Sequence, residues 1–265
     1  AKKYYRSILL IGNFDGLHIG HQKLFKIAEQ YKKKINLKIG VITFDPIPKM
    51  FFNPNFKNYR ISNFEQKIHF LKKLKVDFIV NKKFDKKFSR IKHYNFVKNI
   101  LYKKIRPSYI FVSNNFRFGN KREGNVLSLR KSEKKFNYKI INPIPLKKKT
   151  KIVSSSLIRH YLEIGNIKKA NIFLNRNWTI IGNVETGRKL GRKIGFPTCN
   201  IDIKDYVVAK PGVYCVKVKI YGSNKIYKGI ANLGFRPTFN QNKILLEVNI
   251  FNFSKNIYSK KLKVE

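Results

Sequence analysis

The chain has 265 residues, 43% hydrophobic and 14% aromatic, with 58 Lys and Arg against 14 Asp and Glu, for a formal net charge of +44. The hydrophobic content is typical of a globular protein and excludes a disordered one, and the length allows two domains with separate cores. No apolar run approaches the roughly 20 residues of a membrane-spanning helix, so we expect no membrane insertion.

The first predicted element is a short buried strand at Ile8–Ile11, which is followed directly by a turn containing three glycines. Apolar residues then recur at helical spacing, which predicts a helix beginning near Gly20 or His21. At such a junction the backbone N–H groups of the helix start can face a bound phosphate, and His18 and His21 stand on either side of it. We therefore predict a nucleotide site here, in preference to a helix cap with two solvated histidines.

Alternating strands and helices are predicted over the next hundred residues. Apolar runs at 37–44, 76–80 and 109–112 predict strands, while a capping box at 62–65 and the spacing at 96–101 predict helices. This alternation favours a parallel sheet covered on both faces, and hence an α/β fold. Prolines at 46 and 48 predict that the second strand ends in an extended loop at the ligand-binding edge.

Two later segments carry side chains suited to ligand contact. After the strand at 109–112, Asn115 can hydrogen-bond a heterocycle, and Phe116 or Phe118 can either stack on one or pack the loop onto the core. Three consecutive serines and Arg159, at 154–159, either cap a helix or form a phosphate clamp of hydroxyls, helix dipole and planar cation.

The periodicity changes after about residue 175. Apolar and polar residues alternate at 216–220 and again at 246–250, which predicts an antiparallel sheet or small barrel, with a domain boundary near 175–180. Between 187 and 200, glycines recur every four residues among Lys and Arg, which suits phosphate binding but lacks the Walker A order. Glu247 lies inside a predicted strand, where Glu is depleted, on the face opposite its apolar neighbours.

The stretch GNFDGLHIGH at 12–21 resembles the G-x-F-D-G-x-H-x-G-H signature of the HxGH nucleotidyltransferases. The segments SSSLIR at 154–159 and GRKLGRKIGFPTCN at 187–200 resemble later motifs of the bacterial bifunctional riboflavin kinase/FMN adenylyltransferases, also called FAD synthetases. The resemblance to this family runs over essentially the whole chain.

For the first half, the resemblance implies that His18 and His21 are catalytic and that Asn115 and Phe116 contact flavin or nucleotide. It also implies that Ser155, Ser156 and Arg159 grip the departing pyrophosphate, with Ser156 replacing the family's Thr. The other ATP- and phosphate-binding residues that it implies here are Gly12, Phe14, Asp15, Gly16 and Gly20. Ile47 replaces the usual His between the two prolines, so we assign that loop no catalytic role.

For the second half, the resemblance implies that Thr198 and Asn200 hold Mg²⁺ and that Glu247 is the catalytic base of the kinase. The implied phosphate-binding residues are Gly187, Gly191, Arg192 and Gly195. This sequence departs from the family pattern at four nearby positions: Cys199 replaces Ala, Asn249 replaces His, and Asn252 and Asn256 replace Asp. Family members also continue beyond the position of Glu265 into C-terminal helices that cover the flavin site, and these helices are expected to be absent here.

We therefore expect an α/β doubly wound nucleotidyltransferase domain of the HxGH type at 1–175, followed by a small antiparallel β-barrel riboflavin kinase domain at 176–265. The resemblance implies that the kinase converts riboflavin to FMN, and that the first domain adenylylates FMN to FAD with release of pyrophosphate. Mg²⁺ is the implied cofactor, ATP the co-substrate, and FMN and FAD the products.

Two alternatives stay open: an adenylyltransferase whose second domain only binds flavin, and a basic nucleic-acid-binding protein. The excess charge is mostly Lys and is spread along the chain, so we attribute it to the composition of the source proteome and expect no nucleic-acid partner. The N-terminus leads directly into the first strand, and Cys199 and Cys215 have no metal-site spacing. These features predict a cytoplasmic protein without a signal peptide, whose oligomeric state is open.

Overall fold

The computed structural model describes residues 4–56, 58–148, 150–185, 197–203, 205–238 and 241–265, with the backbone alone at 236–238 and 241–243. The chain divides into two compact units. The first contains Ala1–Phe56 and Glu65–Val153, and the second contains Lys57–Phe64 and Ser154–Glu265. Among the described helices, none has both the length and the hydropathy of a transmembrane span.

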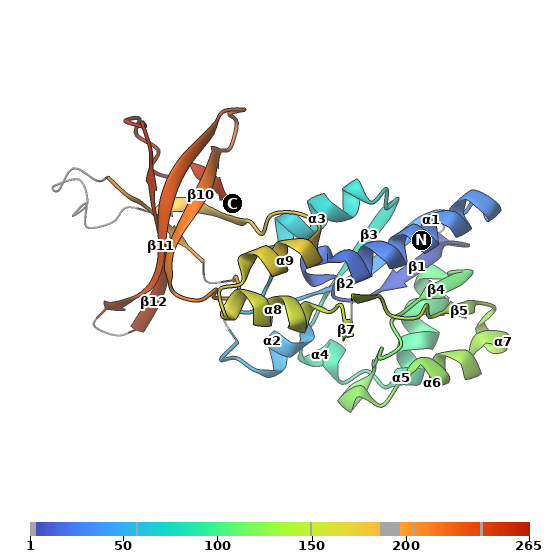
Figure 1. Cartoon of the computed structure of the whole chain (residues 1–265). Helices are drawn as coiled ribbons and strands as arrows, with labels where there is room; N and C mark the ends of the chain where they lie inside the picture. The colour runs from blue at the N-terminus through green and yellow to red at the C-terminus, as the bar shows by residue number, and fades with distance from the viewer. Residues whose placement is uncertain (1–3, 57, 149, 186–196, 204, 239–240) are drawn as a thin grey trace. The chain divides into compact units, whose positions relative to one another are not determined.

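The first unit is built on a five-stranded parallel sheet in the order β3-β2-β1-β4-β5 (Figure 1). The chain order reverses on either side of β1, which makes the sheet doubly wound, as predicted. The strands are β1 (Ile8–Ile11), β2 (Ile39–Asp45), β3 (Phe78–Lys83), β4 (Tyr109–Phe111) and β5 (Lys139–Ile141).

Helices cover both faces of this sheet because alternate residues of its strands point in opposite directions. Ile8 and Leu10 of β1 belong to one buried cluster, with residues of α1 (Ile19–Ile35) and α3 (Phe64–Lys73). Leu9 and Ile11 belong to the other cluster, with the π-helix η3 (Phe96–Ile105), α6 (Val126–Lys131) and α7 (Glu133–Phe136). The covered sheet predicted from the apolar runs is therefore confirmed.

Shorter elements complete the first unit. They are the 3₁₀ turns η2 (Asp15–Leu17) and η4 (Asn120–Arg122), the helices α2 (Pro48–Phe52), α4 (Lys86–Ser89) and α5 (His93–Asn95), and the hairpin of β6 (Lys147–Lys148) and β7 (Lys151–Ile152). Helix α2 differs from the predicted extended loop. Pro48 is the first residue of α2, where its missing N–H costs nothing, so this proline opens a helix after β2 has ended.

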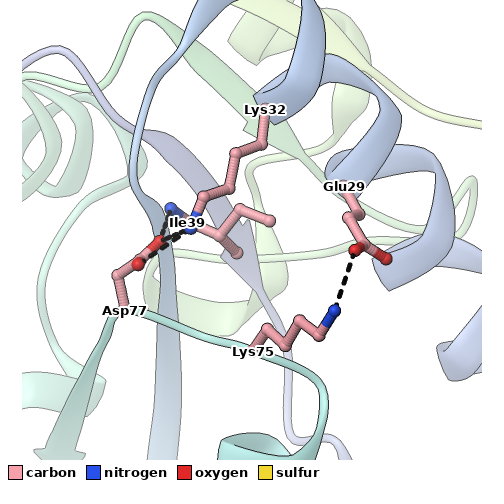
Figure 2. A network of polar contacts seen from close by, with 5 residues as sticks. All are labelled: Glu29, Lys32, Ile39, Lys75 and Asp77. Carbon is pink, nitrogen blue, oxygen red and sulfur yellow. Dashed lines mark hydrogen bonds and ion pairs between the residues drawn. The ribbon is translucent and has the colours of Figure 1, made fainter.

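A polar network joins helix α1 to the amino ends of β2 and β3 (Figure 2). Asp77 accepts hydrogen bonds from Lys32 Nζ at 2.7 and 2.8 Å and from the backbone N–H of Ile39 at 2.7 Å. Lys75 and Glu29 form a looser ion pair at 3.7 Å beside it. This network lies at the end of the sheet away from the carboxyl ends of the strands, so it supports the fold and not the ligand site.

The second unit contains a closed antiparallel barrel in the order β10-β11-β12-β9-β8-β13, of which β10, β11 and β12 are labelled in Figure 1. Its strands are β8 (Ile180–Glu185), β9 (Cys199–Asp202), β10 (Gly212–Ile220), β11 (Ile226–Thr238), β12 (Gln241–Ile250) and β13 (Lys261–Val264). The barrel predicted from the two-residue alternation is thus confirmed.

Two helices, α8 (Ser155–Glu163) and α9 (Ile167–Leu174), group with the barrel in the second unit. Gly165 between them has φ +77°, the left-handed conformation of a residue that ends a helix. The segment 57–64 joins the same unit, where Arg60 N donates to Asp205 O at 2.9 Å and Trp178 Nε1 donates to Ile61 O at 2.9 Å. The compact second unit therefore includes residues that precede the predicted domain boundary near 175–180, and that boundary stays a prediction.

Candidate active sites

In the first unit, the predicted nucleotide motif lies where a doubly wound sheet binds its ligands. Strands β1 and β4 pair with each other at the point where the strand order reverses, so residues 12–21 and 113–119 follow two adjacent carboxyl ends. Gly12 N donates to Ile42 O at 3.1 Å, and Thr43 Oγ1 donates to Asn13 O at 3.2 Å. The strand β2 thereby fixes the start of the motif.

The turn itself has an unusual backbone, since Phe14, Gly16 and Leu17 have φ of 48°, 73° and 40°. Left-handed φ values are unfavourable for Phe and Leu, and such residues persist only where the surroundings over-determine them. Here Phe14 and Leu17 are each 2% exposed, and both belong to the buried cluster that contains Ile8, Leu10 and residues of α1 and α3. Burial of these two anchors therefore holds the turn in a shape that its backbone alone would not favour.

His18 and His21 lie on either side of the first residues of α1, as the sequence predicted, and the structure adds that their rings are in contact. His18 is the N-cap residue, and its Nδ1 accepts a hydrogen bond from His21 N at 3.3 Å. The two rings are stacked with centroids 3.7 Å apart. Because Nδ1 of His18 is an acceptor in this contact, the proton of its neutral ring is on Nε2, which can donate to an anion.

His21 is held in its neutral form by its surroundings. Burial and the neighbouring His18 lower the pKa of His21 well below 6.5. Within the described residues, its Nδ1 is a buried atom without a hydrogen-bond partner. A polar ring atom left unsatisfied beside a helix N-terminus is compatible with an anionic ligand there.

Gly20 is closely packed at the same place. A Cβ at this position would lie 3.1 Å from the His18 ring and 3.3 Å from the carbonyl oxygen of Val153. A larger residue would therefore displace the imidazole of His18 or the chain that leads to Ser154.

Lys67 is a residue near this motif whose position no sequence pattern predicts. It lies on α3, is only 3% exposed, and donates from Nζ to Thr43 Oγ1 at 3.0 Å. Through Thr43 it is connected to Asn13 of the motif, so a buried lysine lies beside the strand that fixes the turn. In the sequence Lys67 is one lysine among many on an amphipathic helix, so no sequence signal distinguishes it from solvated ones.

The predicted flavin contacts follow β4. Asn115 is exposed, and its Oδ1 accepts a hydrogen bond from Ser113 Oγ at 2.9 Å. Phe116 is partly buried and stacks on Phe118 at 5.5 Å, and Phe118 is 8% exposed in the core. The two aromatic residues thus pack together over the core, and a flavin contact by Asn115 or Phe116 stays a prediction.

The serine motif begins α8 in the second unit. Ser154 is the N-cap residue and accepts from Leu157 N at 3.2 Å, while Ser155 and Ser156 are the first two residues of the helix. Arg159 is 7% exposed; its Nε donates to Tyr59 O at 2.7 Å, and its guanidinium lies 3.7 Å from the Tyr59 ring centroid. Arg159 therefore has a clear structural role within its unit. A phosphate-binding role for Ser155, Ser156 and Arg159 stays a prediction.

In the barrel, the register of β9 and β12 brings two predicted site residues together. Asn200 pairs directly with Glu247, and both lie on the face opposite the buried pair Ile201 and Leu246. Asn200 is only 8% exposed, yet within the described residues its Oδ1 has no hydrogen-bond partner. Glu247 is partly buried, and Thr198, two residues before Asn200, is exposed.

The same strands fix the segment that precedes Asn200. Asn249 Nδ2 donates to Pro197 O at 2.9 Å, and Cys199 Sγ contacts Val248 O at 3.2 Å. Burial raises the pKa of Cys199 to about 11, so this thiol is a protonated structural group. Asn249, where the family usually has His, therefore helps to position the loop that carries Thr198.

Four predicted phosphate-binding residues, Gly187, Gly191, Arg192 and Gly195, lie outside the described residues. In the part of the chain that is described, no group of three or more His, Cys, Asp or Glu side chains is placed to hold a metal ion.

Comparison with known proteins gives matches for both halves. A family model described as FAD synthetase matches residues 1–157, and one described as Riboflavin kinase matches residues 174–265. A protein of Buchnera aphidicola subsp. Schizaphis graminum, named Bifunctional riboflavin kinase/FMN adenylyltransferase, is 39% identical over 97% of this chain and 83% of its own length. The protein of the same name from Escherichia coli K12 is 32% identical over 97% of this chain and 82% of its own length.

Among solved structures, one described as "Crystal Structure of Macrolide-efflux Protein from Streptococcus pneumoniae" is similar with a TM-score of 0.85 and 29% identity, covering 98% of this chain and 84% of that one. The efflux activity in that description is stated of the Streptococcus protein only. The two family models, which cover the sheet and the barrel in turn, and the relatives, which align with nearly the whole chain, agree with each other. The chain belongs to the family of bifunctional riboflavin kinase/FMN adenylyltransferases.

Proposed function

We propose that the chain makes FAD in two steps: ATP-dependent phosphorylation of riboflavin to FMN, then adenylylation of FMN with release of pyrophosphate. The presence of both halves on one chain carries this proposal, since the FAD synthetase and riboflavin kinase models match successive segments. Riboflavin, FMN and ATP are then its small-molecule substrates. A cytoplasmic location, expected from the two unpaired cysteines, stays a prediction.

In the adenylylation step the FMN phosphate attacks the α-phosphorus of ATP, and the bond to pyrophosphate breaks. Negative charge on the phosphate oxygens would be stabilised by the backbone N–H groups at the start of α1 and by the Nε2–H of His18. His21 is neutral before an anion binds, because burial and His18 lower its pKa. A nearby phosphate favours the charged imidazole, so nucleotide binding would raise that pKa and let His21 take up a proton.

In the kinase step, Thr198 and Asn200 would hold Mg²⁺, and Glu247 would act on the hydroxyl of riboflavin. The residues fit the ion because the buried Oδ1 of Asn200 lacks a hydrogen-bond partner within the described residues, and oxygen ligands are those that Mg²⁺ prefers. When bound, Mg²⁺ neutralises charge on the transferring phosphoryl group. Glu247, the cross-strand neighbour of Asn200, would orient the 5′-hydroxyl and accept its proton.

The direct test is incubation of the full chain with riboflavin, ATP and Mg²⁺, followed by chromatographic separation of FMN and FAD. We expect both products. FAD formation from supplied FMN without any FMN formation from riboflavin would instead support an adenylyltransferase whose second half only binds flavin.

Substitutions in each half separate the two activities. His18→Ala and His21→Ala should each lower FAD formation by about 10²–10³, the scale for loss of one well-placed donor, and leave FMN formation nearly unchanged. Glu247→Gln should lower FMN formation by about 10² and leave adenylylation of supplied FMN unchanged. An equal loss of both activities in any of these variants would indicate a structural role for that residue.

A further inference from the structure

A row of polar residues crosses three neighbouring strands of the barrel. Glu185 of β8 pairs directly with Asn200 of β9, and Asn200 pairs on its other side with Glu247 of β12. Directly paired residues point to the same face of a sheet, with Cβ atoms about 4.5–5.5 Å apart. Glu185 and Glu247 therefore lie on either side of Asn200, on the same surface of the sheet.

The residues next to this polar row, one position away on each strand, are apolar, so the polar residues occupy one face only. Val184, Ile201 and Leu246 are each one position away on the same three strands, and they are 3%, 0% and 4% exposed. These apolar residues fill the barrel interior, so Glu185, Asn200 and Glu247 point to the opposite face.

Asn200 supplies an independent indication that a ligand belongs here. The residue is 8% exposed, and within the described residues its Oδ1 is buried without a hydrogen-bond partner. Leaving a buried acceptor unsatisfied is unfavourable, and the neighbouring residues in the row, Glu185 and Glu247, cannot donate to it when they are ionised. A divalent cation bound here would satisfy the amide oxygen, and carboxylate oxygens are ligands that such cations prefer.

We propose that Glu185 provides a carboxylate ligand for the divalent cation that Asn200 binds. This inference rests on the proposed kinase function and deepens it, because it assigns different roles to the two acidic residues. Glu185, on one side of Asn200, binds the cation, and Glu247, on the other side, stays available to the substrate hydroxyl.

The test is titration of the chain of residues 1–265 with Mn²⁺, with and without ADP, followed by electron paramagnetic resonance of free Mn²⁺. Glu185→Gln keeps the size of the side chain and removes its charge, and we expect Mn²⁺ affinity to fall by about 10–100-fold, the range for lost groups at metal sites. Glu185→Asp, which keeps the carboxylate, should retain more affinity than Glu185→Gln.

Asp205→Asn is the matched control, because it removes one negative charge from an exposed position of the same unit outside the polar row. We expect its Mn²⁺ affinity to stay within twofold of the parent. The proposal is overturned if Glu185→Gln binds Mn²⁺ as tightly as the parent, if Asp205→Asn loses as much affinity, or if Glu185→Asp loses as much as Glu185→Gln.

The experiments distinguish an error in the proposed kinase function from an error in the assignment of Glu185. If the parent chain binds Mn²⁺ but never forms FMN from riboflavin and ATP, the kinase function is wrong. If the parent forms FMN and Glu185→Gln leaves Mn²⁺ binding unchanged, the assignment of Glu185 alone is wrong. Equal thermal melting temperatures for parent and variants exclude unfolding as the cause of lost binding.

Discussion

At the scale of single residues, His21 should make the stability of the first unit depend on pH. Its pKa lies well below 6.5 in the folded chain, because of burial and His18, and near 6.5 in the unfolded chain. The unfolded state therefore binds more protons below pH 6.5, and stability should fall as the pH drops through this window toward the lowered pKa.

We predict that His21→Gln reduces this loss, measured as the change in urea midpoint between pH 7.5 and 5.5. His69→Gln, an exposed histidine of α3, is the control and should keep the parent's dependence. If His21→Gln loses as much stability on acidification as the parent, His21 is not the buried neutral group described above.

Gly20→Ala should have two opposing effects on the free energy of unfolding. Alanine favours a helix over glycine by about 1 kcal/mol, but its Cβ would lie 3.1 Å from the His18 ring and 3.3 Å from Val153 O. We expect the free energy of unfolding to change little and FAD formation to fall about tenfold, because the imidazole is displaced. Gly234→Ala, whose Cβ would meet nothing closer than 3.9 Å, should leave FAD formation unchanged. A normal rate in Gly20→Ala would show that the His18 ring can move without cost.

At the scale of elements, the contact between β12 and the chain before β9 should control the metal site. Asn249→Ala removes the hydrogen bond to Pro197 O, so the loop that carries Thr198 should be held less firmly. We expect the Mg²⁺ concentration for half-maximal FMN formation to rise about tenfold, with a smaller change in kcat.

Asn249→His should restore most of the Mg²⁺ response, since an imidazole N–H can replace the amide donor. Asn183→Ala, an exposed residue of β8, is the matched control and should behave as the parent. A similar Mg²⁺ response in Asn249→Ala and Asn183→Ala would show that the contact with Pro197 is incidental.

Local patterns predicted many of the elements but not their partners. The apolar run at Ile8–Ile11 is β1 to the residue, and the alternation at 246–250 lies inside β12, because both patterns reflect burial of a single strand. The pairing of Asn200 with Glu247 depends on register between strands far apart in sequence, which no local pattern contains. The role of Lys67 was missed for the same reason: its burial depends on the packing of α3, and its sequence context is that of a surface lysine.

At the scale of the whole molecule, we predict that a fragment of residues 1–175 converts FMN to FAD but melts at a lower temperature than the full chain. Both predicted phosphate motifs of the first half lie within this fragment. Residues 57–64 and α8, however, would lose partners in the second unit, including the bonds of Arg60 N to Asp205 O at 2.9 Å and of Lys210 N to Leu162 O at 3.0 Å. Each such hydrogen bond contributes about 1 kcal/mol.

Differential scanning calorimetry and an FAD assay on the fragment test this prediction. The proposed domain of 1–175 would be contradicted by a folded fragment that binds ATP and forms no FAD. Equal melting temperatures for the fragment and for the first transition of the full chain would show that the lost contacts contribute nothing.

The interruption of the first unit by residues 57–64 also has a consequence for synthesis on the ribosome. Asn58 Nδ2 donates to Ile203 O at 2.9 Å, and these two residues are 145 positions apart in the chain. At about 5–20 residues per second, the partner of this segment is made roughly 7–30 s after the segment itself. During that interval the first unit, which is formed by the chain before and after this segment, can fold as soon as residue 153 has emerged. Residues 57–64 cannot form their contacts until the barrel has been synthesised. A nascent chain stalled between these two points should therefore expose this segment to proteases next to a sheet that already resists them.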